Sequence, residues 1–144
     1  MATSIRTLVE NKLALILGDA LSLISADQNT TIPVIAGDRG QDIPWEYVMV
    51  EVTESERKDQ NVFTVEAGIQ VMGTADRNSG IDRANQNFKI VSDYFAAGPN
   101  CPFYNFADNE LKVYGFWVEG SQEIRGARTY GEQLNVIIAC QQLS

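Results

Sequence analysis

The segment from Ile69 to Phe95 changes its hydrophobic period part-way, and this change constrains the fold more than any other feature. Ile69 and Val71 alternate with polar or small residues, as residues of a half-buried strand do. After the polar stretch 73–80, apolar residues recur at helical steps: Ile81, Ala84, Phe88, Val91 and Phe95. That spacing places them on one face of a helix. The sequence therefore predicts a strand followed by an amphipathic helix that packs on a sheet.

Similar patterns predict the remaining elements. An apolar stripe from Ile5 to Ile24 predicts a first amphipathic helix of about five turns. Apolar alternation predicts strands at Trp45–Thr53, Val62–Met72, Leu111–Glu119 and Gln133–Cys140. The resulting order is α-β-β-α-β-β. Because hairpins on both sides of a helix favour antiparallel pairing, we expect an α+β two-layer sandwich: a mostly antiparallel four-stranded sheet with both helices on one face.

Polar segments separate these elements. Residues 27–44 have the Asn, Pro, Gly and Asp content of an exposed loop. Glu54–Asn61 and Gly120–Glu132 are interpreted as hairpin loops, and they are long for a small domain. Long ordered loops usually have partners. Solvated loops without partners explain the same residues, so both interpretations stay open.

Size and charge limit the possible functions. The 144 residues are 44% apolar and 21% charged, which indicates one globular domain over residues 1–144. The net charge of −8 opposes a general phosphate-binding surface for nucleic acid. The N-terminal region includes charges and no apolar run of membrane length, so we expect neither a signal peptide nor a membrane span. Cys101 and Cys140 lack metal-ligand spacing and are expected to be buried or partly buried free thiols.

The residue types leave little catalytic chemistry. The chain has no histidine, which removes Ser-His-Asp and Cys-His catalysis and most catalytic zinc sites. Gly73 and Gly80 are followed by Ile-Asp instead of the Lys-[Ser/Thr] of a phosphate-binding P-loop. Asp108, Glu110 and Lys112 remain, since Glu-x-Lys at a strand start can belong to a metal-dependent nuclease. A polar strand start explains them better, so we expect no enzyme, no metal and no cofactor.

The order of elements resembles the tail terminator and tail completion proteins of tailed bacteriophages. These are the small neck subunits that cap the tail tube and join it to the head. Besides the N-terminal helix, the resembling segments are residues 33–52, 62–73, 81–95, 111–120 and 130–140. Together they span nearly the whole chain.

The resemblance implies a structural protein of the virion tail or neck, present in the host cytoplasm during assembly. It implies a homo-oligomeric ring, usually a hexamer, that stops growth of the tail tube protein and contacts the head-side connector protein. Genomic DNA would pass through the lumen as cargo, where carboxylates repel phosphate; no membrane is involved. A head-completion, connector or other neck protein of the same particle is the alternative.

Charged residues of the two polar segments are the candidate contacts in such a ring. They are Glu54, Glu56, Arg57, Lys58, Arg125 and Arg128. Arginine side chains can form bidentate pairs with carboxylates of a neighbouring subunit. The same arginines can equally serve as surface groups that keep the chain soluble.

Overall fold

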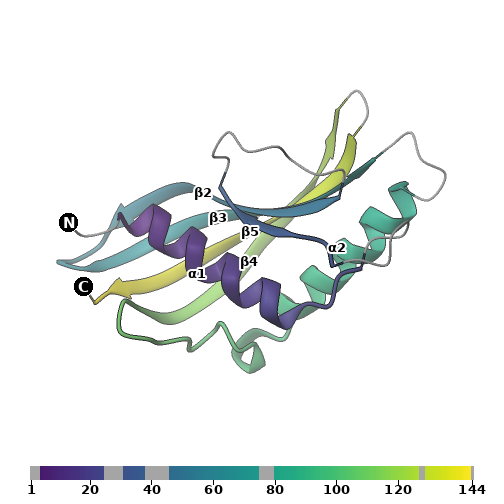
Figure 1. Ribbon diagram of the computed structural model, residues 1–144. Coiled ribbons are helices and arrows are strands. Elements are labelled where there is room, and N and C mark those ends of the chain that lie inside the picture. Colours follow the sequence, from purple (N-terminus) through teal and green to yellow (C-terminus); the bar gives the residue numbers. More distant parts are fainter. Residues whose placement is uncertain (1–3, 25–30, 38–45, 75–79, 127–128, 144) are drawn as a thin grey trace.

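The computed structural model describes residues 4–24, 31–37, 46–74, 80–126 and 129–143. The elements are α1 (Ile5–Ala20), β1 (Val34–Ala36), β2 (Tyr47–Arg57), β3 (Val62–Thr74), α2 (Gly80–Ala96), a 3-10 turn (Gly98–Asn100), β4 (Leu111–Arg125) and β5 (Thr129–Gln142). The strands form one open sheet in the order β1-β2-β3-β5-β4 (Figure 1). The fold class is therefore α+β, as expected.

The expected four-stranded sheet is wrong in one respect, because a fifth strand is present. β1 lies within the segment expected to be a loop, and it pairs with β2 in parallel. The other pairs are antiparallel, so the sheet is mixed and the order is α-β-β-β-α-β-β. β1 escapes sequence analysis because three residues between Pro33 and Gly37 are too few to show a period.

The two polar segments expected to be long loops are largely strand. β2 continues to Arg57 and β3 begins at Val62, and the Lys58 amide donates to the Val62 carbonyl at 2.8 Å. β4 continues to Arg125, opposite Tyr130 on β5. Backbone groups pair along a ladder whatever the side chains are, so strands can extend beyond the apolar core.

Both helices pack on the same face of the sheet. Leu8, Val9, Leu13 and Leu17 of α1 share one apolar cluster with Val91 and Phe95 of α2. The sheet contributes to this cluster the residues Val48, Val50, Val52, Phe63, Val65, Ala67, Ile69, Val71, Leu111, Val113, Phe116, Leu134, Val136, Ile138 and Cys140. Figure 1 shows α1 crossing in front of the sheet and α2 beside it at one end. The opposite, more polar face carries residues such as Glu66, Gln70 and Gln133, together with the apolar residues Met49, Ile137 and Trp117.

The apolar face predicted for α2 is confirmed with one exception. Ala84, Val91 and Phe95 are buried, and Phe88 packs partly buried against the core. Ile81 is 36% exposed, so its assignment to the core is wrong. Ile81 lies in the first turn of α2, so no helical turn precedes it.

A buried carboxylate fixes α1 to the sheet. Glu10 Oε2 accepts a hydrogen bond from the Val52 amide at 2.8 Å and lies 3.6 Å from Arg6 Nε. Glu10 is only 5% exposed, although it occupies a helix that the sequence describes as a simple apolar stripe. This bond satisfies a backbone donor at the position where β2 bulges and extends past β1.

Candidate interaction surfaces

The structure places the predicted contact residues at opposite ends of the sheet. Glu54, Glu56 and Arg57 lie on β2, and Lys58 follows them in the β2–β3 turn. Arg125 ends β4 at the other end of the sheet, where β3 and β5 also meet the β4–β5 turn. Arg128 lies outside the described residues. The two groups therefore form two surfaces of one subunit, not one site.

The first surface is acidic. Glu54 faces Glu66 directly across the β2–β3 ladder, and Glu56 faces Thr64. With Ile137 of β5, these four residues line a depression of about 140 Å³ on the polar face of the sheet. Like charges placed opposite one another are destabilising. A basic group from outside the subunit would relieve that repulsion.

The two cations near this surface have partners within the subunit. Lys58 Nζ lies 3.1 Å from Glu56 Oε1. The Arg57 guanidinium lies over the Phe63 ring, 5.5 Å from its centroid. Within the described residues, neither of these two cations pairs with Glu54 or Glu66, which face each other across the ladder.

The second surface presents a cation on an exposed strand end. Arg125 forms an ion pair with Glu123 on the same strand and lies over the Tyr130 ring, 5.2 Å from its centroid. Its guanidinium side chain is 67% exposed. Exposed pairs of this kind contribute little to stability, so Arg125 can exchange partners at low cost.

The residues of the nuclease hypothesis do not form a Glu-x-Lys site. Lys12 of α1 bridges the two carboxylates, with Nζ 2.7 Å from Asp108 and 2.8 Å from Glu110. The other Asp108 oxygen accepts from the amides of Glu110 and Leu111 at 2.8 Å. Lys112 instead lies over the Tyr114 ring, 5.1 Å from its centroid. The cluster joins α1 to the start of β4, a contact with no signal in the local sequence.

The ion pairs shift the pKa values of this cluster. Hydrogen bonds to Asp108 and Glu110 raise the pKa of Lys12 above 10.5. Burial acts to raise the pKa of Asp108, but the hydrogen bonds from Lys12 and two amides outweigh it, and the pKa falls below 3.8. A carboxyl group whose pKa is lower in the folded state stabilises that state above its unfolded pKa. This stabilisation is lost as the pH falls through the lowered value.

We expect the gap in the free energy of unfolding between the parent protein and the Asp108→Asn variant to depend on pH. The gap should be full at about pH 6 and smaller at about pH 2.5, because the stabilisation by the ionised carboxyl group declines once the pH falls below the unfolded pKa of that group. Urea unfolding of both proteins at the two pH values measures it. Asp59→Asn, in an exposed turn, is the control and should change stability by less than about 0.5 kcal/mol. An Asp108→Asn gap of equal size at both pH values would contradict the assignment.

Other chemistry is sparse in the described part of the chain. There, no group of three or more Cys, Asp or Glu side chains is placed to hold a metal ion. Neither described helix is long and apolar enough to cross a bilayer. Cys101 and Cys140 are free and buried, as expected, and burial raises the pKa of Cys140 to about 12.

Sequence analysis missed the exposed edge of β4. The start of β4 is covered, since the Val113 amide donates to the Phe106 carbonyl at 2.7 Å. Beyond it, β4 has β5 as its one neighbour among the described strands. Trp117 is 54% exposed and stands opposite Ile137 on the polar face. The alternation of the segment predicts a strand but does not reveal that this strand lies at an edge.

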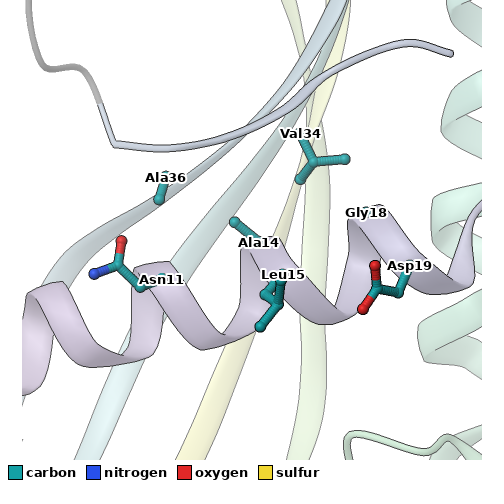
Figure 2. Close-up of a pocket in the computed structure, with 7 residues that line it drawn as sticks. All are labelled: Asn11, Ala14, Leu15, Gly18, Asp19, Val34 and Ala36. Atoms are coloured by element: carbon teal, nitrogen blue, oxygen red, sulfur yellow. The ribbon is translucent and has the colours of Figure 1, made fainter.

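Sequence analysis also missed a groove between α1 and β1. The helix contributes Asn11, Ala14, Leu15, Gly18 and Asp19, and the strand contributes Val34 and Ala36 (Figure 2). The volume of the groove is about 460 Å³. Because β1 was not predicted, this groove had no signal in the sequence.

No protein-family model matches the chain, and no curated protein matches its sequence.

Proposed function

We propose that the chain is a tail terminator: a structural virion protein that forms a homo-oligomeric ring, caps the tail tube and joins it to the head-side connector. The resemblance in element order supports this proposal. That resemblance rests on the predicted order α-β-β-α-β-β, to which the structure adds the short strand β1. In the proposed hexameric ring, DNA passes through the lumen as cargo.

The position of the two charged surfaces carries the proposal. A head-to-tail ring requires two different, complementary surfaces on each subunit. The acidic depression around Glu54 and Glu66 lies at one end of the sheet, and Arg125 lies at the other. In the proposed contact, Arg125 of one subunit lies between Glu54 and Glu66 of the next. This pairing removes the repulsion within one subunit and uses an exposed cation of its neighbour.

The pairing predicts the outcome of a charge swap. Arg125→Glu should prevent ring formation, because it places a third carboxylate against Glu54 and Glu66, and like-charge contacts at interfaces cost several kcal/mol. Adding Glu54→Arg to the same chain should restore the ring. Light scattering coupled to size-exclusion chromatography measures the assembled mass at low and high salt. Lys89→Glu, on the exposed face of α2, is the control and should assemble normally.

Assembly of an Arg125→Glu chain equal to that of the parent protein would exclude this contact. The function itself is tested on virions that lack the chain. Overlong tails would identify a terminator, whereas tails of normal length that stay unattached would identify another neck joining protein. Absence of the chain from purified virions would overturn both assignments.

A further inference from the structure

The backbone of β1 leaves one row of hydrogen-bonding groups directed away from the sheet. The Pro33 carbonyl accepts from the Val48 amide at 2.9 Å, and the Gly37 amide donates to the Val50 carbonyl at 2.7 Å. Successive residues of a strand direct their backbone groups to opposite sides. The amides and carbonyls of Val34 and Ala36 therefore point to the outer edge, where the described part of the chain supplies no further strand. Such an edge is a template for another extended segment.

The side chains of the same two residues line the groove against α1. Figure 2 shows Ala14 on the side of α1 that faces Val34, with Asn11, Leu15 and Asp19 along the same part of the helix. Ala14 and Gly18 are small, and together with Ala36 they leave space at the base of the groove. Leu15 stands at its rim and is 63% exposed. The open strand edge and the apolar space thus lie side by side.

Charge distinguishes the two ends of the groove. Asp19 lies near the C-terminal end of α1 and is exposed, while Asn11 lies toward the other end. No basic residue is among the described residues that line the groove, and the chain as a whole carries a net charge of −8. A ligand with a basic side chain near Asp19 would be favoured by local attraction and by the field of the whole protein.

We propose that this groove binds an extended peptide segment of a protein partner, which adds to the sheet beside β1 as a further strand. Its backbone pairs with the outward groups of Val34 and Ala36. Alternate side chains, apolar and of moderate size, occupy the space over Ala14 and Gly18, and a lysine or arginine faces Asp19. An edge strand next to a helix supports this mode of recognition: backbone bonds supply affinity and side-chain pockets supply specificity. The site is separate from both surfaces of the proposed ring.

Selection from a random linear heptapeptide library, using the purified chain as bait, tests the proposal. We expect selected peptides to combine apolar residues at alternate positions with a lysine or arginine. Their affinities for the chain are then measured by fluorescence polarisation. Failure of the library to yield binders, or selection of peptides without a basic residue, would overturn the proposal.

Variants of the groove locate the binding. Among the described residues, a Cβ atom at Gly18 would meet the Val34 Cβ alone, at 4.0 Å, so the position accepts a side chain and Gly18→Leu should fill the groove. We expect it to weaken binding at least tenfold, and Asp19→Lys to do the same. Gln86→Leu on α2 and Asp59→Lys in the β2–β3 turn make similar changes elsewhere and should bind normally. Leu15→Ser, at an exposed position, is the second groove variant if circular dichroism shows that Gly18→Leu is unfolded.

Backbone methylation of a selected peptide tests strand addition directly. Methyl groups on the amides that face β1 should abolish binding, whereas methyl groups on the alternate amides should be tolerated. Hydrogen exchange at the amides of Val34 and Ala36 should slow when the parent peptide binds. Equal tolerance at all positions, or unchanged exchange at both amides, would show that the peptide does not extend the sheet.

Discussion

A Phe95→Ala variant is expected to unfold with a free energy about 3–5 kcal/mol lower than that of the parent protein. Phe95 is 1% exposed and packs edge-to-face against Phe116, with 5.4 Å between ring centroids. The substitution removes an aromatic side chain at the junction of α2 and β4 and leaves a cavity that rigid neighbours cannot fill. For a chain of this size the melting temperature should fall by roughly 10–20 °C. Urea and thermal unfolding followed by circular dichroism measure both quantities.

The matched control lies on the same helix. Ile90 is 42% exposed, so Ile90→Ala should change the stability by less than about 1 kcal/mol. If Phe95→Ala melted within a degree or two of Ile90→Ala, the face of α2 that carries Phe95 would not be part of the core.

A Gly131→Ala variant should lose about 3 kcal/mol, at the upper end of the usual cost of over-packing. Gly131 is buried on β5, opposite Met72 of β3. A Cβ atom there would clash with the Val71 carbonyl oxygen and would lie 3.0 Å from the Met72 Cα. Because these are backbone atoms of a neighbouring strand, the β3–β5 ladder must shift to accept the methyl group. Chemical unfolding, with native amide exchange along β3, measures the loss and its location.

Gly68→Ala provides the comparison. Gly68 lies in β3, the neighbour of β5, and a Cβ atom there would meet the side chain of Gln133, with the nearest atom at 2.7 Å. That side chain can rotate away, at the expense of its hydrogen bonds to Gln70 and Asn135. We expect a loss of about 1 kcal/mol. Equal losses for the two variants would mean that the backbone contact at Gly131 is not as close as described.

Much of the core could be predicted from the sequence. Period-2 alternation in Val62–Met72 and period-3.6 spacing in Ala84–Phe95 identify buried faces, because each repeats the geometry of its own element. Strand ends could not be predicted in the same way. The polar residues Glu54 and Arg125 predict loops, yet backbone pairing extends β2 and β4 through them.

The candidate sites depended on contacts that are distant in sequence. Lys12 and Asp108 are far apart along the chain, so no motif reveals their ion pair. The opposition of Glu54 and Glu66 depends on the register of one ladder, which follows a bulge between Val52 and Glu54. A shift of one residue would turn these side chains to opposite faces. The acidic surface is thus a property of strand pairing.

The sequence by itself determined the α+β class, the two amphipathic helices and most residues of the shared core, because local periodicity encodes which face of an element meets the apolar layer. Only the tertiary structure decided which strands lie at the edges, that β1 exists and pairs in parallel, and that α1 leaves a groove beside it. Those features arise from the order of strands in space. Strand order depends on the packing of the whole chain, and no local period records it.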